Sequence, residues 1–553
     1  MVINIAGIKV SLDEGERTLS TKIAEILSVA QESVSSLKVL RKSVDARRNR
    51  PPLIVYTVEA VVPDDVVLSE IAGSEAAVTV LHERKTETSV LVRGGIAKEQ
   101  DLVPCRCPVF HAEGKRKVVV VGSGPAGLFA ALTLAEKGIP VLLLERGKPI
   151  SERCRDVQDF WERGELDGES NVHFGEGGAG AFSDGKLTSR AKNPNMRLIK
   201  ETLVELGAQS DILIDAKPHI GTDKLRNVAV NFRGKLLSLG CEIRFGAKVS
   251  DFLIRAGRVA GVVVNGEEEV GAGCLIKAAG QNAGDTYAKL HEGGVQLAPK
   301  PIAMGLRVEH PQELINEIQY GKWRRHPALP PPDYFLTAKA SHPPRSVYTF
   351  CMCPGGRIIG CSSSPGGIVT NGMSGSLRDG FYANSAVVVN VTIDDFSGTP
   401  QEPLKGLAFR RYWEEKAFSL GGGNYCAPAE RLTDFLQDRE NDRPVSTSFL
   451  PGIKAAPLRE TLPPFVTEAL KVGLRQFGIK MPGFVGEEAV LVGVETRTSS
   501  PVRILRDANG QSVNTAGLYP CGEGAGYAGG IISSALDGIR AAENVIASRG
   551  VRQ

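Results

Sequence analysis

The sequence lacks the features that would place the chain in a membrane or attract a polyanionic partner. No apolar run approaches the roughly 20 residues that a membrane-spanning helix needs, and the first residues alternate like a strand without a signal-peptide core. The 66 basic and 63 acidic residues leave a net charge of only +3, so charge gives no indication of a nucleic-acid partner. We therefore expect a cytoplasmic protein with no membrane span.

Cysteine is sparse and irregularly placed. The ten cysteines spread over 553 residues have neither metal-ligand spacing nor the density of a disulfide framework, so we predict reduced thiols and no metal site. Cys351 and Cys353 form C-x-C. Residues two apart on a strand point to one face but are awkward to bridge. We therefore interpret this pair as packing residues.

Residues 117–147 carry a strand, turn, helix and strand pattern that is typical of a dinucleotide site. Val118–Val121 form an apolar run of the kind a buried parallel strand needs. A G-x-G-x-x-G turn follows, which permits a tight turn, close approach of a pyrophosphate and close helix packing; its glycines are Gly122, Gly124 and Gly127. Glu145 ends the second apolar run, about 20 residues later, where a carboxylate can accept hydrogen bonds from a ribose. That acid favours an unphosphorylated ribose.

Later segments narrow the choice of cofactor. The glycine-rich loop Gly175–Gly185 excludes regular structure and predicts backbone laid against a flat ligand. A helix expected over 224–240 precedes four predicted short strands, which we interpret as a β-meander, and a strand that ends at Ala278–Gly280. A strand at 518–521 then enters a second glycine-rich turn and helix. This layout is typical of flavoprotein oxidoreductases rather than of plain NAD dehydrogenases.

The pattern predicts an α/β protein with a smaller unit at its N-terminus. Strands over 2–10, 36–45, 53–62 and 77–82 with helices over 21–29 and 65–71 give the order β-α-β-β-α-β, which indicates a ferredoxin-like α+β domain. We divide the chain into four parts: this domain (1–110), the first part of a Rossmann-like nucleotide-binding domain with its meander (111–299), a mixed α+β substrate or cap domain (300–480) and the C-terminal part of the nucleotide-binding domain (481–553).

Several long motifs support a resemblance to a known family. GSGPAGLFAALTLAEKGIPVLLLERG, NVHFGEGGAGAFSDGKLTSR and LYPCGEGAGYAGGIISSALDGIRAA are together similar to the bacterial family of uncharacterised FAD-dependent dehydrogenases, within the glutathione-reductase-like FAD/NAD(P)-binding superfamily. The similarity covers nearly the whole chain. Two positions depart from the superfamily pattern: Glu523 stands where Asp is common, and Ala-Ala-Gly at 278–280 replaces the more usual Ala-Thr-Gly.

The resemblance implies one FAD per chain and a set of residues around it. The first turn would hold the pyrophosphate, Glu145 the adenosine ribose, the glycine-rich loop the region near the flavin, and the last turn the ribityl chain and ring. The implied residues are Gly122, Gly124, Pro125, Ala126, Gly127, Glu145, Arg146, Gly177, Gly178, Ala179, Gly180, Ser183, Gly185, Lys186, Ala279, Gly280, Gly522, Glu523, Gly529, Gly530 and Ile531.

Flavin carries the electron-transfer chemistry, so the protein has to position a substrate near N5 and exclude water. No second strand, G-x-G-x-x-G and helix unit is present, so NAD(P)H would bind only transiently as an electron donor, or another donor serves. Disulfide-reductase chemistry is disfavoured, because Cys154 stands alone where a C-x-x-x-x-C pair would follow the first motif.

Candidate catalytic residues come from the charged and titratable side chains near these motifs. Arg497 could stabilise a substrate anion or the charge at N1 of the reduced ring, and Lys186 could do the same. His310 is a candidate acid or base, and so are His173, Glu495 and Tyr527, although a lone histidine is more often a structural residue.

We interpret the chain as an FAD-dependent oxidoreductase that transfers hydride between flavin N5 and a small organic substrate. A flavin-containing RNA-modifying or RNA-binding factor is the alternative, suggested by the ferredoxin-like unit and the basic run that contains Arg41, Arg47, Arg48 and Arg50. A non-catalytic FAD-binding sensor is a third hypothesis. Salt-dependent RNA binding would favour the second, and lack of reduction by any donor would favour the third.

Overall fold

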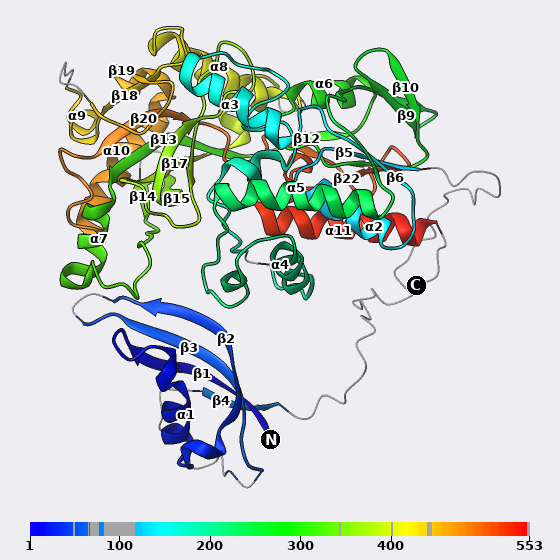
Figure 1. The fold of residues 1–553 in the computed structure, drawn as a ribbon. Helices are drawn as coiled ribbons and strands as arrows, with labels where there is room; N and C mark the ends of the chain where they lie inside the picture. The colour runs from blue at the N-terminus through cyan, green and yellow to red at the C-terminus, as the bar shows by residue number, and fades with distance from the viewer. Residues whose placement is uncertain are drawn as a thin grey trace. The chain divides into compact units, whose positions relative to one another are not determined.

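The structure, a computed structural model, describes residues 1–47, 50–64, 66, 77–81, 117–189, 191–341, 344–399, 402–439 and 445–549. Over these residues the chain forms two compact units (Figure 1). The N-terminal unit draws on Met1–Arg106, Gln209–Pro218 and Gln319–Pro332, and the main unit on the remaining segments.

A four-stranded antiparallel sheet in the order β2-β3-β1-β4 forms the N-terminal unit. Its elements are β1 (Val2–Ser11), α1 (Leu19–Leu27), β2 (Ser35–Asp45), β3 (Leu53–Val61) and β4 (Ala77–Leu81). Every second residue of β3 is buried, because successive side chains of a strand point to opposite faces, and α1 packs Leu19, Ile23 and Leu27 into the same core. The second helix predicted over 65–71 lies almost entirely outside the described residues, so the ferredoxin-like fold stays a prediction.

The basic run of this unit is engaged in local contacts. The edge strand β2 is covered at Lys42, whose backbone N–H donates to the carbonyl of Ile214 at 2.9 Å and whose carbonyl accepts from Ala216 at 2.9 Å. Arg47 pairs with Asp45, whereas Arg48 lies outside the described residues. The contacts at Lys42 and Arg47 use part of the basic run within its own unit.

The main unit begins with a five-stranded parallel sheet in the order β22-β11-β5-β6-β7. Its strands are β5 (Val118–Val121), β6 (Val141–Leu144), β7 (Glu242–Arg244), β11 (Leu275–Lys277) and β22 (Leu518–Pro520). The residues of β5, β6, β11 and β22 are all buried, as expected of parallel strands covered on both faces. Strand β11, from the middle of the sequence, is therefore hydrogen-bonded to the early strand β5 on one side and to the late strand β22 on the other.

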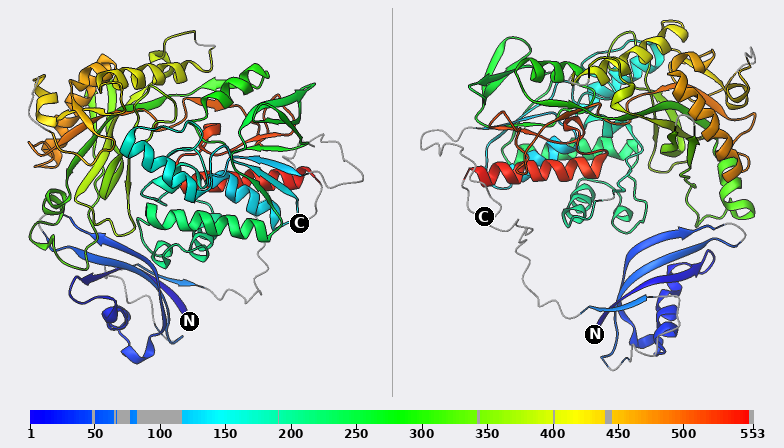
Figure 2. Two further views of the ribbon diagram at one scale, coloured as in Figure 1. Left: turned by 45° about the horizontal axis from the view of Figure 1, so that its top comes forward. Right: turned by 180° about the vertical axis from the view of Figure 1, so that it is seen from behind.

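Three helices pack together beside this sheet: α2 (Pro125–Ala135), α5 (Thr222–Ser238) and α11 (Ile531–Ser548). Phe129 of α2 meets Phe232 of α5 edge to face with ring centroids 5.2 Å apart. Figure 2 shows α11, in red, running alongside α2 in both views. The two helices come close because residue 538 is glycine: a Cβ at Gly538 would overlap the backbone of Ala126.

Our prediction of a four-stranded meander is wrong for one of its strands. The meander has three antiparallel strands, β8 (Val249–Arg255), β9 (Arg258–Val264) and β10 (Glu268–Gly271). The first predicted strand, β7, instead pairs in parallel with β6 as the edge of the large sheet. A short strand that is only partly buried has the same alternating pattern in either place, so the sequence could not distinguish them.

A second, eight-stranded sheet follows the path β14-β15-β17-β13-β20-β18-β19, with β16 beside β15. Its strands are β13 (Ile302–Pro311), β14 (Thr337–Ser341), β15 (Pro344–Gly360), β16 (Thr370–Ser374), β17 (Tyr382–Val391), β18 (Ala427–Arg431), β19 (Ile453–Ala455) and β20 (Val490–Glu495). Helices α8 (Lys405–Leu420) and α10 (Pro464–Lys480) pack on it. Strand β20 lies beyond position 480, where we placed the end of the cap domain.

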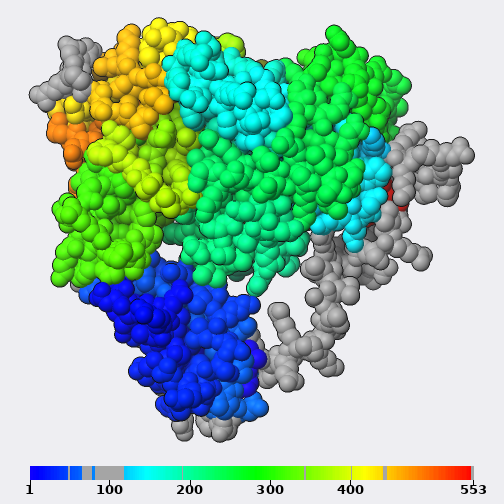
Figure 3. Space-filling view, in the orientation of Figure 1, coloured from blue at the N-terminus to red at the C-terminus, as the bar shows by residue number. Residues whose placement is uncertain are grey.

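The other described helices and strands lie around the two sheets. These are α3 (Ile150–Arg163), α4 (Asn195–Glu205), α6 (Gly284–Glu292), α7 (Gln312–Tyr320), α9 (Leu432–Gln437), β12 (Leu297–Pro299) and β21 (Val502–Ile504). Helix α3, cyan at the surface in Figure 3, is fixed to the second sheet where the indole N–H of Trp161 donates to the carbonyl of Gly360 at 2.8 Å. Within the described ranges, no helix is long and apolar enough to cross a membrane.

The contact between α2 and α11 predicts a strong effect of one added methyl group. We expect Gly538→Ala to force the helices apart and to destabilise the main unit by roughly 2 kcal/mol, as overpacked cores do, which lowers the melting temperature by several degrees. Gly234→Ala is the matched control, because a Cβ at Gly234 of α5 would meet nothing within 4 Å and alanine favours helix. Equal melting temperatures for the two variants would contradict the packing argument.

Candidate functional site

The first turn of the parallel sheet is held by two glycines, Gly122 and Gly127, whose surroundings leave no room for a side chain. Gly122 has φ +104°, and a Cβ there would lie 2.9 Å from the carbonyl oxygen of Ala278. A Cβ at Gly127 would overlap the carbonyl of Gly122. Helix α2 begins at Pro125 after the N-cap Gly124, and no side chain caps its first turn. Its amino end can therefore offer backbone N–H groups and a positive dipole to an anion.

Two further backbone segments meet this turn. Gly522 follows β22 and has φ +76°. It lies so close to α2 that a Cβ there would be 2.8 Å from the Cβ of Ala126, and a Cβ at Gly524 would overlap the carbonyl of Ala279. The N–H of Gly522 donates to Asp537 of α11 at 2.8 Å. The predicted residues Ala279, Gly280, Gly522 and Glu523 thus gather at the carboxyl ends of β11 and β22. Gly529 and Gly530, with open space around them, lead into α11 at Ile531.

The predicted glycine-rich loop lies against the first turn. The N–H of Gly177 donates to the carbonyl of Ser123 at 3.1 Å, and a Cβ at Gly178 would lie 2.8 Å from the Cα of Gly124. The loop continues through a short 3-10 turn, Gly178–Phe182, that includes Ala179 and Gly180, and then through Ser183 to Gly185, which has φ +71°. Two glycine segments that are far apart in the sequence therefore share one surface.

Arg153 of α3 holds this loop, and sequence reasoning missed it. Its guanidinium is fully buried and donates to four carbonyls at 2.5–3.0 Å: those of Asn171, Val172, Glu176 and Gly178. Burial lowers the pKa of Arg153 to about 10, although nearby carboxylates oppose that shift. The amphipathic pattern of α3 placed Arg153 on a buried face, but only the fold brings the loop around it.

The Glu145 carboxylate connects the turn to the loop. One oxygen accepts from the N–H and the hydroxyl of Ser123, each at 2.8 Å, and the other accepts from the N–H groups of Gly147 and Gly175 at 3.0 and 2.9 Å. Our expectation gave this acid to a ribose. The structure shows that it also fixes the protein backbone, so the ribose contact stays a prediction.

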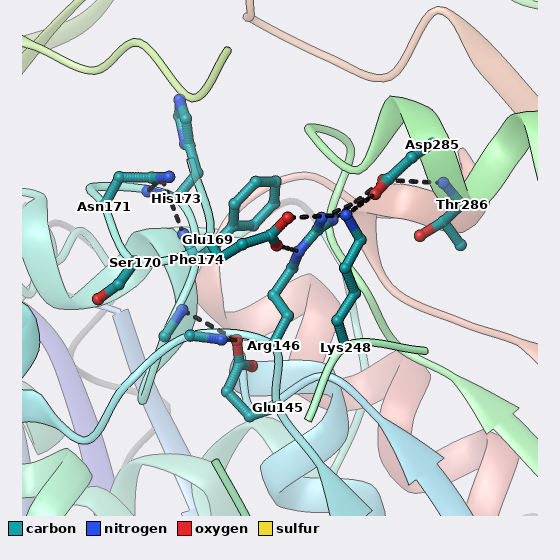
Figure 4. Close-up of polar contacts among 12 residues, drawn as sticks. Glu145, Arg146, Glu169, Ser170, Asn171, His173, Phe174, Lys248, Asp285 and Thr286 are labelled. Atoms are coloured by element: carbon teal, nitrogen blue, oxygen red, sulfur yellow. Dashed lines mark hydrogen bonds and ion pairs between the residues drawn. The ribbon is translucent and has the colours of Figure 1, made fainter. Parts of the chain in front are cut away.

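Arg146 has a different setting from the cofactor contact we expected. Its guanidinium pairs with Glu169 at 2.6 Å and with Asp285 at 2.7 Å, and Lys248 reaches the same two acids at 2.7 and 3.0 Å (Figure 4). Phe174 lies 4.2 Å beneath the guanidinium. Burial alone would raise the pKa of Asp285, but the hydrogen bonds and charges of Arg146 and Lys248 lower it. Arg146 therefore ties helix α6 to the segment that precedes the glycine-rich loop.

Arg497 is also committed to protein groups. It donates to both oxygens of Glu414 at 3.0 and 2.9 Å, to Asn282 at 3.1 Å and to Ser363 at 2.5 Å. Its charge is thus balanced by a buried carboxylate, so the role that we expected for Arg497, at a substrate anion or at N1 of the reduced ring, stays a prediction. Burial alone would lower the pKa of Arg497, but Glu414 raises it.

Arg410 and Glu523 belong to the same network, but their charges are linked through a neutral amide and not by a direct ion pair. Arg410 donates to the amide oxygen of Gln281 at 3.0 Å, and the amide nitrogen of Gln281 donates to Glu523 at 2.8 Å. Burial, followed by the charge of Arg497, lowers the pKa of Arg410 to about 10. Burial raises the pKa of Glu523 to about 7. Sequence reasoning found Glu523 but gave no signal for Arg410, which lies within helix α8.

The two histidine candidates differ. His173 points away from the Glu169 and Asp285 group in Figure 4. Its ring nitrogens are enclosed, and no hydrogen bond of ordinary geometry reaches them from the described parts of the chain, although the backbone of Cys361 is close. Burial, with the charge of Arg497 next, lowers its pKa well below the ordinary value. His173 is therefore a neutral polar group available to a ligand.

His310 has the surroundings of a packing residue, which corrects our expectation of a catalytic role. It is fully buried on β13, its Nε2 interacts with the carbonyl oxygen of Phe484 at 2.8 Å, and its ring lies 4.7 Å from that of Phe484. Burial lowers the pKa of His310 to about 4. A catalytic base near neutral pH needs a higher pKa and access to substrate.

The remaining candidates are also paired. Lys186 forms an ion pair with Asp184 at 2.7 Å and lies 3.7 Å from the sulfur of Cys353. Glu495 pairs with Arg307 at 3.0 Å in the second sheet. Tyr527 is 40% exposed and stacks on Arg506, with 3.9 Å between the guanidinium and the ring centre.

Lys277 is a buried cation at the junction of the three turns. It ends β11 with no exposed surface, donates to the carbonyl of Ala279 at 3.0 Å and lies 4.6 Å from the ring centre of Tyr287. Burial lowers its pKa to about 7. A lysine inside an apolar strand pattern is the sequence signal that could have identified Lys277, which our prediction did not include.

Comparisons with known proteins agree with this geometry. Residues 301–498 match the family "FAD-dependent protein, C-terminal domain-like", residues 117–154 match "FAD binding domain", and residues 2–61 match a domain of unknown function. An uncharacterised protein of Clostridium beijerinckii is 42% identical over 549 residues, which cover 99% of each chain. The chain belongs to a family of uncharacterised FAD-dependent proteins.

More distant relatives match a part of the chain. An FAD-dependent monooxygenase of Hypoxylon pulicicidum is 28% identical over 32% of this chain and 41% of its own. A thiamine thiazole synthase of Aeropyrum pernix is 31% identical over 27% of this chain and 43% of its own. Among solved structures, a geranylgeranyl bacteriochlorophyll reductase-like protein from Thermoplasma acidophilum covers 79% of each chain at 14% identity and a TM-score of 0.35.

The site fits the cofactor of this family. The cradle of Gly122, Gly124 and Gly178 would be filled by larger residues, the amino end of α2 carries no side-chain cap, and the enclosed ring of His173 has hydrogen-bonding capacity to spare. A flat group with a pyrophosphate and polar ring atoms can use all three.

The clamp formed by Arg153 predicts a loss of order in the loop. We expect Arg153→Met to leave four buried carbonyls without their donor and to destabilise the main unit by roughly 3 kcal/mol, with faster proteolytic cleavage between residues 171 and 185. Arg155→Met on the exposed side of the same helix is the control. If Arg153→Met changed neither the melting temperature nor the cleavage rate, the claim that Arg153 holds the loop would be contradicted.

Lys277 predicts a particular pH dependence in the FAD-free protein. Burial depresses the pKa of Lys277 in the folded protein to about 7. The free energy of unfolding is therefore highest above the pKa of lysine in the unfolded chain, and it decreases as the pH falls to the folded pKa. We expect Lys277→Met to gain stability over the wild type as pH falls from about 10 to 7, by roughly 3 kcal/mol for a shift of this size. Urea unfolding at several pH values measures it, with the exposed Lys137→Met as a control whose profile should parallel the wild type.

Proposed function

We propose that this protein is an FAD-dependent oxidoreductase of the glutathione-reductase-like superfamily that exchanges hydride between flavin N5 and a small organic substrate. The observation that carries the proposal is the junction of three turns at the carboxyl ends of β5, β11 and β22, beside the uncapped end of α2. Ligands of open parallel sheets bind at this edge. The family to which the chain belongs supports FAD as that ligand.

The residues have separate roles in this proposal. The turn Gly122–Gly127 and the first N–H groups of α2 hold the pyrophosphate, and Glu145 orders the backbone around the adenosine end. The loop that Arg153 clamps and the turn at Gly522 enclose the flavin end. FAD supplies the two-electron chemistry when bound.

The polar network beside Gln281 gives the protein's own contribution at the reactive end. Arg410 donates to the neutral amide oxygen of Gln281, so its positive charge can stabilise a developing anion in a dry site. Arg497 positions Glu414 and the backbone around it rather than contacting substrate. His173, kept neutral by burial, can donate or accept one hydrogen bond at a bound ring.

Partners and placement are part of the same proposal. The substrate is a small molecule, and NAD(P)H serves as a transient electron donor. We place the protein in the cytoplasm, which the free cysteines among the described residues support, since thiols persist in a reducing compartment.

The proposal predicts a separable loss of cofactor. A Cβ at Gly124 would meet only the Cα of Gly178 at 3.8 Å, and the backbone there has φ −75°. We therefore expect Gly124→Val to fold but to fill the space for the pyrophosphate, so that the purified variant loses the yellow flavin absorbance while its melting temperature stays close to that of the FAD-free wild type. Gly234→Ala, remote from the turn, should keep full FAD content.

The redox step is tested on the loaded wild type. Anaerobic mixing with NADH or NADPH should bleach the flavin absorbance, and a substrate panel should restore or remove it. A colourless protein that cannot be reconstituted with FAD would sink the proposal. Bound FAD that no donor reduces would instead favour the sensor hypothesis.

A further inference from the structure

The C-x-C pair lies in a distorted part of β15 and not in a regular strand. Cys351 has φ +48°, a left-handed conformation that a non-glycine residue adopts at a cost of about 1 kcal/mol. The pairing of β15 with β17 shifts register between Phe350 and Cys353 and again before Gly356. Within this bulge the Cys353 thiol lies back over Cys351 and donates to its carbonyl at 3.3 Å. The pair is therefore not the simple packing that the sequence indicated.

Cations from two other segments reach the pair. Lys186 of the glycine-rich loop lies 3.7 Å from the Cys353 sulfur, and Arg307 of β13 donates to the carbonyl of Cys351 at 3.4 Å. Arg307 is held by Glu495 at 3.0 Å and Asn384 at 2.7 Å. Arg307 and Cys353 have no exposed surface.

The charges around the pair do not balance without an anion. Among the residues that the structure describes, the charged and titratable side chains that face the cysteines or their cations are Lys186, Arg307, Arg378, Asp184, Glu495, Tyr334 and His219. Three of these described side chains are basic, and two are carboxylates. Burial raises the pKa of Glu495, so at least one positive charge is in excess. Buried charge needs a partner, and a thiolate supplies it.

The two thiols take different roles in this environment. The neighbouring Cys353 thiol, with Lys186 and Arg307 nearby, lowers the pKa of Cys351 to about 5, whereas the pKa of Cys353 is raised. Burial raises the pKa of Cys241 to about 11 and also raises those of Cys361 and Cys521. Cys351 is partly exposed and Cys353 is buried, so the low-pKa sulfur is the accessible one.

We propose that Cys351 and Cys353 form a redox-active dithiol that exchanges with low-molecular-weight disulfides, a second activity of this chain that does not need the flavin. The Cys351 thiolate attacks one sulfur of a disulfide R–S–S–R, which forms a mixed disulfide and releases R–S⁻. Cys353 then attacks the Cys351 sulfur, releasing the second R–S⁻, which takes up the Cys353 proton. The pair loses two electrons and one proton, and the small disulfide becomes one thiol and one thiolate.

The first test is the pH dependence of alkylation in the reduced wild-type protein, followed peptide by peptide by mass spectrometry. We expect the rate at Cys351 to level off above about pH 6, whereas an ordinary thiol is half-maximal near pH 8.5. Lys186→Met should slow labelling of Cys351 about fivefold at pH 5, as a one-unit rise in pKa would. Cys426→Ser, which removes another partly exposed cysteine, should leave the profile unchanged.

The second test uses oxidised glutathione as the disulfide, with FAD-loaded and FAD-free protein compared. Wild-type protein should end as an internal disulfide without bound glutathione, Cys353→Ser should stop at glutathione on Cys351, and Cys351→Ser should show neither product. Labelling of Cys351 with the same pH profile as Cys426 would overturn the proposal, and so would persistent glutathione on Cys351 in the wild type. Since the expected products are the same with and without FAD, failure of the flavin proposal would leave these results unaffected.

Discussion

The close approach of three backbone segments at one edge of the parallel sheet is the constraint on which the rest of the structure depends. The turn after β5, the end of β11 and the turn after β22 come within contact of one another because glycines stand at the crossing points, among them Gly122 and Gly524. Side chains cannot occupy these positions, so the surface presented there is mostly backbone. The helices α2 and α11 can lie side by side only because the same rule holds at Gly538.

Buried polar side chains then hold the backbone of the glycine segments in place. Backbone without side chains has few contacts of its own, and glycine has more conformational freedom to lose on folding than any other residue. Glu145 holds the first turn and the start of the loop through four hydrogen bonds, and Arg153 holds the middle of the loop through four more. Both groups are buried and fully engaged, so the site is ordered largely by protein contacts.

The sequence predicted those parts of the site that depend on local pattern. The strands at 118–121 and 518–520, the glycine turns after them and the loop before Gly185 follow from apolar runs and from glycine spacing, which act over a few residues. The partners of charged side chains could not be predicted, because they depend on packing of distant segments. Arg497 and Arg146 were expected to serve a ligand but meet Glu414 and Asp285, and nothing local marks Arg153 or Arg410. The assignment of β7 failed for a similar reason, since a short strand carries no signal of its sheet.

The position of β22 has a consequence for the order in which the molecule can be assembled. This strand is the last in the sequence, yet it pairs with β11, and the helix that follows it packs on α2 near the start of the main unit. Contacts of such long sequence separation form late, because chain closure costs entropy before the contact is made. During synthesis the first turn therefore emerges long before the segments that enclose it, and the nascent chain carries an open glycine-lined edge until β22 and α11 have been made.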